Sequence, residues 1–410
     1  MTSERAYEIL GLDSNSTPDE AHTAYKELAK IYHPDKNTAA NATVMFRLIQ
    51  DAWQYIQDTS EEESTQPLED VETYIDQENA MLEQANQGDT MLDQEEYEAA
   101  VVYYDKALAL SPASPIAHVV YSQRGTAKYL LGQYETAISD FDEALRLKPD
   151  YQHSYIPLYR RGMVKSAIRE YFAAIADFDE ALRLKPDYSI AYFGRGMAKY
   201  DMSQYVASIS DFDKAIRLNP NYALAYVQRG RAKVGNGDYF AAISDYDTAL
   251  RLEPDNAIAY YYRGSAKIDM DQYRAAISDF DEAIRLDPYY ARFYSLRGLA
   301  KRNLEEYFAA IIDFDKAIHL VPDYAPYYVF RGQIKAFPLK RYEAAIMDYD
   351  EAIRLEPDDA DTYFYRAKAK GILGRVWEEK RDLQTALKLA ELSGDDELIA
   401  EIESWIREFY

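Results

Sequence analysis

The 410-residue sequence contains no cysteine and only five histidines. Without cysteine the chain can form no disulfide, no thiolate metal site and no thiol nucleophile. The histidines are His22, His33, His118, His153 and His319, and they are scattered without the close spacing typical of zinc ligands. We therefore expect neither a metal site nor another cofactor.

Basic residues are also scarce relative to acidic ones. The chain has 46 Lys and Arg against 71 Asp and Glu, which gives a formal net charge of −25. A surface of this charge repels a phosphate backbone and is not attracted to anionic lipids. We expect no nucleic-acid partner and no binding to an anionic membrane surface.

Long apolar runs are missing as well. No stretch approaches the ~20 residues that a helix needs to span a bilayer. The first ten residues, MTSERAYEIL, lack a basic region followed by an apolar one, the pattern of a secretory signal. The sequence thus predicts no membrane span and a cytoplasmic protein.

A repeated pattern dominates most of the chain. Seven similar 13-residue strings run from Ala137–Pro149 to Ala345–Pro357, and a weaker copy, Ala100–Pro112, precedes them. Their closing prolines are spaced 37, 37, 34, 34, 34, 34 and 35 residues apart. An Arg-Gly pair, such as Arg263-Gly264, precedes each of the seven strings. A period of this length predicts supersecondary repeats that stack on one another.

Each period is expected to form two helices joined by a turn. In residues 189–220, the first helix is predicted near 190–201, and Gly196 lets a neighbouring helix approach closely. The second helix carries an apolar stripe that ends before Pro220. The stripe consists of Ile209, Phe212, Ala215 and Ile216. Neither helix can bury its apolar face alone, so neighbouring repeats must pack together in an all-α fold.

This pattern resembles the tetratricopeptide repeat (TPR) family. The family order of bulky, small, aromatic, Ala, aromatic, Ala and Pro is matched by Tyr226, Gly230, Tyr239, Ala242, Tyr246, Ala249 and Pro254. The resemblance implies an α-solenoid, a right-handed superhelix of helix pairs. We assign nine repeats within 79–391, at about 81–112, 118–149, 155–186, 189–220, 223–254, 257–288, 291–322, 325–357 and 360–391. The apolar face of 395–410 predicts a capping helix, with a partner-binding helix as the alternative.

Two repeats depart from the common length. The interval from the closing proline to the next Arg-Gly pair is 12 residues for Pro112 to Arg124 and for Pro149 to Arg161, against 9 for Pro186 to Arg195. We expect these additions to lengthen inter-repeat turns or helix starts.

The recurring charged residues are interpreted as architectural. We predict that the arginine of each first helix pairs with an aspartate of a second helix, for example Arg263 with Asp279 or Asp281. The many paired acids belong to this periodic pattern, and no pair stands apart as in an acid–base active site. The sequence also lacks a phosphate loop and a nucleophile motif, so we expect no enzyme activity.

Residues 1–58 lack this periodicity and form a separate module. We expect a short helix near 4–10, a second helix opened by Thr17-Pro18-Asp19-Glu20 and a third around Phe46 and Trp53. The second and third helices should form an antiparallel hairpin with His33-Pro34-Asp35 in the loop at its tip. Residues 59–78 carry eight acidic residues and no Lys or Arg, which predicts an acidic linker to about Pro67 and helix beyond it.

The module resembles a J-domain, the module of DnaJ-type co-chaperones. The matching residues are Tyr7-Glu8-Ile9-Leu10-Gly11-Leu12, Ala24-Tyr25-Lys26, Leu28-Ala29, Tyr32-His33-Pro34-Asp35-Lys36-Asn37, Phe46 and Ile49 through Trp53. In that family the tripeptide and a basic helix face engage an ATP-bound DnaK-class (heat-shock protein 70 class) chaperone and stimulate its ATPase. The resemblance implies that the chaperone-binding residues are His33, Pro34, Asp35, Tyr25, Lys26 and Lys30.

This module departs from the family in its charge. The second helix has His22 and Thr23 where basic residues are usual, and Glu27 follows Lys26. With 5 basic and 9 acidic residues, 1–58 has a net charge of −4. Electrostatic steering toward an acidic chaperone surface should be weaker than usual. A module that no longer activates a chaperone is therefore the alternative.

In the TPR family the first helices line the concave groove and select partners. By that resemblance the groove residues are Tyr159, Arg160, Met163, Phe193, Met197, Val227, Gln228, Arg231, Tyr261, Tyr262, Ser265, Leu299, Arg302, Val329, Phe330 and Gln333. Apolar, aromatic, Arg and Gln side chains suit an extended peptide or an amphipathic helix. The asparagines of the family's clamp for acidic chaperone tails are lacking. We predict a co-chaperone that binds a client or partner protein in this groove, with a TPR assembly scaffold carrying an inactive J-domain as the alternative.

Overall fold

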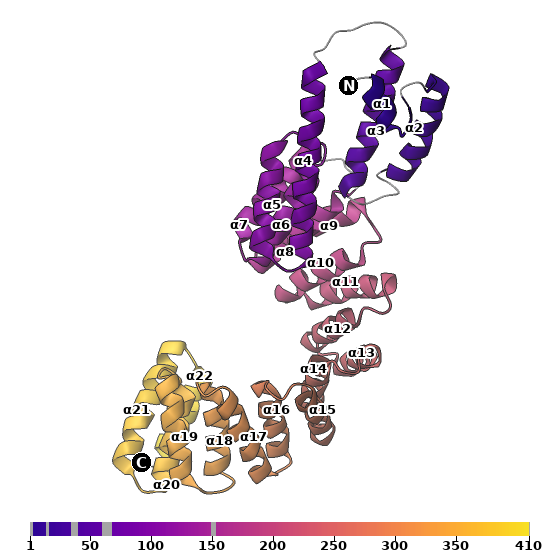
Figure 1. Cartoon of the computed structure of the whole chain (residues 1–410). Coiled ribbons are helices and arrows are strands. Elements are labelled where there is room, and N and C mark those ends of the chain that lie inside the picture. The colour runs from indigo at the N-terminus through magenta and orange to yellow at the C-terminus, as the bar shows by residue number, and fades with distance from the viewer. Residues whose placement is uncertain (1–2, 14–15, 34–39, 60–67, 149–152, 410) are drawn as a thin grey trace. The chain divides into compact units, whose positions relative to one another are not determined.

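The computed structural model of the chain describes residues 3–13, 16–33, 40–59, 68–148 and 153–409 (Figure 1). Within these ranges the fold is all-α, as predicted, with twenty-two helices and no strand. The helices are α1 (Ser3–Ile9), α2 (Pro18–Tyr32), α3 (Ala40–Thr59), α4 (Leu68–Asp93), α5 (Tyr97–Leu110), α6 (Ala117–Leu130), α7 (Tyr134–Leu147), α8 (Tyr155–Ala167), α9 (Tyr171–Leu184), α10 (Ser189–Asp201), α11 (Tyr205–Leu218), α12 (Ala223–Gly235), α13 (Tyr239–Leu252), α14 (Ala257–Ile268), α15 (Tyr273–Leu286), α16 (Ala291–Asn303), α17 (Tyr307–Leu320), α18 (Ala325–Ala336), α19 (Tyr342–Leu355), α20 (Ala360–Ile372), α21 (Val376–Ser393) and α22 (Asp396–Phe409).

The first three helices form a small core of their own. Thr17 caps α2 by accepting a hydrogen bond from the backbone N–H of Glu20, and the Glu20 side chain accepts one from the Thr17 N–H at 2.8 Å. His33, just after α2, packs edge-on against Phe46 near the start of α3, while Tyr25 stacks on Trp53 farther along α3. These contacts run in opposite directions along the two helices, so the predicted antiparallel hairpin is confirmed. Buried Ala6, Leu10 and Ile49 join α1 to it.

The chain divides into two compact parts, residues 1–204 and 205–410. The division falls between α10 and α11, inside the fourth predicted repeat. In each part, a first helix packs against the second helix of its own repeat and against the second helix that precedes it. The second part can be followed in Figure 1 from α12 to the pair α20 and α21. Stacking of amphipathic pairs buries the stripes that the periodic sequence predicts.

In the repeats before the ninth, a glycine of the first helix makes room for an aromatic ring of the second helix. A Cβ atom at Gly264 would lie 2.9 Å from the ring of Phe280, which is fully buried. The ninth repeat has Ala367 in place of the glycine, and there a smaller side chain, the buried Leu383, replaces the ring. The two positions thus vary together within one chain, because the helices approach too closely for a Cβ and a ring at once.

An arginine of each first helix bridges two second helices. Arg263 donates from Nη2 to Asp279 Oδ1 at 2.5 Å and from Nη1 to Asp247 Oδ1 at 2.6 Å. Lys267 contacts the other Asp279 oxygen at 2.7 Å. Equivalent contacts of both kinds are made by Arg124, Arg161, Arg229, Arg297, Arg331 and Arg366. The predicted Arg263–Asp279 pair is confirmed.

The alternative pairing with Asp281 is wrong. Asp281 accepts a hydrogen bond from Arg297 of the next repeat, at 2.6 Å. Each arginine reaches back toward the preceding repeat, because a first helix lies between its own second helix and the one before it. These seven equivalent arginines, called the arginine row below, therefore tie consecutive repeats together.

The ends of the repeat array are also fixed by specific contacts. At its beginning, the lengthened turn between α5 and α6 is fastened by the buried Glu78 carboxylate of α4. This carboxylate accepts hydrogen bonds from Ser111 at 2.7 Å and Ser114 at 2.6 Å. At its end, α22 buries Leu398 and Ile402. The predicted capping helix is confirmed, since these residues share a core with α20 and α21.

Candidate functional site

The predicted chaperone-binding residues lie on α2 and just after it. Lys26 and Lys30 are exposed and one helical turn apart, while Tyr25 is half-buried against Trp53, with 5.7 Å between ring centroids. His33 is half-buried, and its ring centroid lies 5.0 Å from that of Phe46. Pro34 and Asp35 fall outside the described residues. The four described residues of the predicted chaperone-binding set thus lie along the C-terminal half of α2 and directly after its end.

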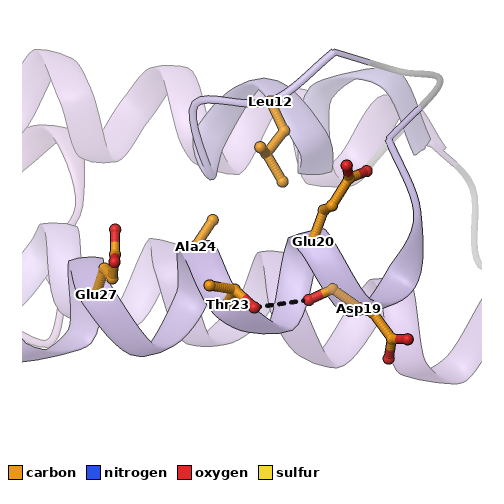
Figure 2. Close-up of a pocket in the computed structure, with 6 residues that line it drawn as sticks. All are labelled: Leu12, Asp19, Glu20, Thr23, Ala24 and Glu27. Carbon is orange, nitrogen blue, oxygen red and sulfur yellow. Dashed lines mark hydrogen bonds between the residues drawn. The ribbon is translucent and has the colours of Figure 1, made fainter.

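Acidic side chains occupy the same stretch of α2. Figure 2 shows a surface pocket of about 420 Å³ lined by Asp19, Glu20 and Glu27 of α2 and by Leu12 of the preceding loop. The hydrogen bonds to Thr17 lower the pKa of Glu20, so this carboxylate stays charged. Glu27 precedes Lys30 by three residues, which makes the two side chains neighbours on the helix surface. The face therefore carries mixed charge.

Most predicted groove residues lie half-buried on the first helices. They fall on α8 and α10 in the first part, and on α12, α14, α16 and α18 in the second. Several are packed on the core beneath them: Tyr159 and Met163 pack on the Phe178 cluster, and Leu299 and Phe330 on the Phe314 cluster. Each such side chain packs on the core with one side and is partly exposed to solvent on the other.

Val227 does not belong to this surface. It is only 1% exposed and sits in the core cluster of α12, α13 and α14. A valine is too short to rise above the neighbouring rings of Tyr226 and Tyr262, which pack against that cluster. The prediction that Val227 contacts a partner is therefore wrong.

Arginines and glutamines of the first helices interact with one another. Arg160 donates to Gln123 Oε1 at 2.6 Å, and Arg231 donates to Gln228 Oε1 at 2.6 Å while its guanidinium lies over Tyr262. The helices α6, α8, α12, α14, α16 and α18 contain no Asp or Glu at all. The first-helix surface is thus much less acidic than the chain as a whole.

The structure adds residues to this surface that the sequence did not single out. Gln123 holds Arg160, and His118 and His153 line a pocket beside it. The only sequence signal for this place was the three-residue lengthening before Arg161, which was interpreted as a change in the turn.

In the described ranges, no cluster of three or more His, Asp or Glu side chains is placed to hold a metal ion. No helix in those ranges is long and apolar enough to cross a membrane.

Comparison with protein families matches both parts of the sequence pattern. The DnaJ domain family matches residues 5–64. Tetratricopeptide repeat families match residues 84–114, 118–151, 159–223, 230–271, 263–325 and 337–374.

Two curated relatives are similar to the first module. Chaperone protein DnaJ of Geobacillus kaustophilus is 43% identical over 58 residues, which is 14% of this chain and 15% of that protein. Chaperone protein DnaJ of Mycoplasma mobile is 46% identical over 52 residues, 13% of this chain and 14% of that protein. The match therefore spans about one seventh of the length of these relatives.

A solved structure resembles the repeats. A tetratricopeptide repeat protein from Parabacteroides merdae superposes with a TM-score of 0.50 and 20% identity, covering 62% of this chain and 99% of that one. At this identity the likeness concerns the fold alone. Together with the family matches, it leads to one conclusion: the chain carries an N-terminal DnaJ domain followed by tetratricopeptide repeats.

Proposed function

We propose that this chain is a co-chaperone that stimulates the ATPase of a DnaK-class chaperone through His33, Pro34 and Asp35. The observation that carries the proposal is the DnaJ-domain match over residues 5–64, on a hairpin whose helix α2 exposes Lys26 and Lys30 and leads to His33. Cations on this face favour an acidic partner surface. The chain itself supplies no active site in this mechanism; the ATP is hydrolysed by its partner.

Single-turnover ATP hydrolysis by the host's DnaK-class chaperone tests the proposal. We expect the wild-type chain to accelerate hydrolysis and the His33→Gln variant to lose the acceleration. His319→Gln, in the last turn of α17, is the matched control, because it makes the same chemical change outside the first module. A His33→Gln variant that stimulates as well as wild type, with unchanged circular dichroism, would contradict the proposed role of the tripeptide.

A second candidate function follows from the carboxylates on α2. Asp19, Glu20 and Glu27 oppose the cations that would meet an acidic partner, which favours a scaffold whose J-domain is weak or inactive. If neither wild type nor control stimulates hydrolysis, the scaffold becomes the better account. Glu27→Lys then provides a sharper comparison: we expect it to raise stimulation at low salt and to lose this gain at high salt.

We also propose that the first helices of the repeats bind a client or partner protein as a peptide or helix. Their half-buried rings and arginine–glutamine pairs are the kind of surface that anchors such segments. Capture from host lysate by full-length protein should lose a bound protein when Arg302 is changed to Glu. Arg285→Glu, on the exposed side of α15, should retain it. Equal capture by both variants and wild type would count against the first-helix surface.

A further inference from the structure

In the second compact part, the second residue of each second helix belongs to a row that we call the outer row. It consists of Val206, Phe240, Arg274, Phe308, Glu343 and Trp377. Its three aromatic residues occur in every other repeat, and they are 60% to 77% exposed. The fold does not require a ring at this place, because the first two repeats have Glu98 and Glu135 there. The exposed rings therefore need another explanation.

A second group of exposed apolar side chains lies one helical turn farther along α17 and α19. Three preceding second helices have exposed serines at this place, namely Ser210, Ser244 and Ser278. Helices α17 and α19 have Ile312 and Met347 instead, which are 66% and 72% exposed. Phe308 and Ile312 are four residues apart and are thus neighbours on the surface of α17. The apolar part of this surface is centred on α17.

Specific contacts join the outer row of one repeat to the next. The guanidinium of Arg341, directly before α19, lies 5.3 Å from the ring centroid of Phe308 on α17. Arg375, directly before α21, pairs with Glu343 of α19 at 2.7 Å, and the Glu343 side chain remains 63% exposed. The ends of α17, α19 and α21 therefore present their outer-row residues on one continuous surface.

The order of residues along the outer row is self-complementary about Phe308. One repeat before it stands the exposed cation Arg274, and one repeat after it the anion Glu343. Two repeats away the residue is aromatic on both sides, Phe240 and Trp377. A two-fold axis at Phe308 that sets two copies antiparallel therefore matches cation with anion and ring with ring. An isologous interface needs a surface of this kind.

We propose that two copies of this chain associate through the outer row, antiparallel and about a two-fold axis at Phe308. Phe308 and Ile312 form the apolar centre, and Arg274 of each copy pairs with Glu343 of the other. Exposed apolar patches are typical of interaction surfaces. The opposite charges on the two sides of the centre favour a second copy over a partner of uniform charge. The dimer is independent of the proposed co-chaperone function and of the first-helix surface.

Sedimentation equilibrium of the full-length protein tests the proposal. We expect a dimer, with twice the 47.2 kDa of one chain. Phe308→Glu should weaken the dimer at least about tenfold, because it places two carboxylates together at the axis. Three other second helices, α5, α7 and α19, have Glu at this place, so the variant is compatible with the fold. The matched control is Phe172→Glu, the same change at the same place of α9, which has no counterpart across the axis.

Ile312→Ser is a second variant that the fold should tolerate, since it introduces the residue that α11, α13 and α15 have at this place. It should also weaken the dimer. Circular dichroism of each variant identifies any loss of helix. If Phe308→Glu fails to fold, Ile312→Ser and the charge variants still decide the outcome.

Charge exchange tests the pairing itself. Arg274→Glu alone sets two carboxylates against each other, and Glu343→Lys alone sets two cations against each other. Each should dimerise at least about tenfold more weakly than wild type. A mixture of the two variants restores opposite charges at both pairs of a mixed dimer. With a fused tag on one variant to give this species its own mass, we expect the mixed dimer to form far more tightly than either variant dimerises alone.

Several results would overturn the proposal. These are a wild-type chain that stays monomeric up to about 100 μM, a Phe308→Glu dimer as tight as that of Phe172→Glu, and mixed dimers no tighter than the single variants. A monomeric wild type that captures a different protein through Phe308 would assign the outer row to that partner and would refute the dimer as well.

Discussion

Replacing Arg263 by alanine should weaken the repeat array at one defined place. The substitution leaves the Asp279 carboxylate, 4% exposed, with Lys267 as its remaining cation. Breaking a buried ion pair by removing one partner costs about 3–5 kcal/mol. Because Lys267 stays 2.7 Å from the carboxylate, we expect a smaller loss of about 2–3 kcal/mol. The contact with Asp247, 53% exposed, adds less than about 1 kcal/mol.

The measurement must resolve single repeats, because an array of this kind does not unfold in one two-state step. Native-state hydrogen exchange followed by mass spectrometry reports local stability along the chain. For Arg263→Ala we expect amides of α14 and α15 to exchange about 30- to 140-fold faster, since 1.4 kcal/mol corresponds to a factor of ten. Peptides from α19 onward should be protected as in wild type.

Arg285→Ala is the matched control for this experiment. Arg285 also pairs with a carboxylate, Glu282 at 2.8 Å, but both side chains are exposed, at 63% and 43%. We expect a change below about 0.5 kcal/mol. If Arg263→Ala and Arg285→Ala exchange alike, the arginine row does not stabilise the array and the argument from burial fails. A second check is Asp279→Asn, after which Arg263→Ala should cost much less.

Three further predictions concern other features. Gly264→Ala should lower the melting temperature, because overlap of the new Cβ with Phe280 costs about 1–3 kcal/mol of stability. Adding Phe280→Leu in the same chain should recover part of this loss. Additive losses would contradict the idea that the glycine is needed to make room for the ring. Gly237→Ala, at φ 85° with open space around it, should cost about 1 kcal/mol in urea unfolding from backbone strain alone, whereas Glu305→Gly, at φ 63°, should be neutral or stabilising. His118 has a folded-state pKa of about 4, below the ordinary value of 6.5, so the unfolded chain binds its proton first and stability falls as pH drops from 7 toward 4. This loss, at most about 3 kcal/mol, should be absent in His118→Asn, and identical pH profiles for the two proteins would refute it.

The periodic sequence predicts the helices of the repeats well, and the reason is local. From the first repeat to the eighth, each second helix begins at a recurring tyrosine and ends two residues before its proline, and each first helix carries the glycine that the facing ring requires. These signals lie within one repeat and recur along the chain. The first module is predicted equally well from the Thr17 cap and the apolar faces of α2 and α3.

The sequence could not settle features that depend on the stacking of repeats. Neighbouring repeats offer Arg263 or its equivalent similar Asp-Phe-Asp or Asp-Tyr-Asp triplets, so the sequence alone does not say whether the arginine reaches to Asp247 or to Asp281. The position of Val227 within its repeat predicts that it lies on the surface. Its burial depends on the size of the side chains around it, which that position does not specify.

Charge is divided between the two kinds of helix in a way that bears on partner choice. Second helices such as α7 and α19 carry four acidic residues each, while the first helices α6, α8, α12, α14, α16 and α18 carry none. Within the repeats the negative charge is therefore concentrated on the second helices, whereas most of the net charge of the chain lies in residues 1–93, which carry 5 basic and 20 acidic residues. A basic partner is therefore attracted to the second-helix side, and an acidic one is repelled least at the first helices. If the first-helix surface binds a partner, acidic segments are the ones that this charge distribution guides there.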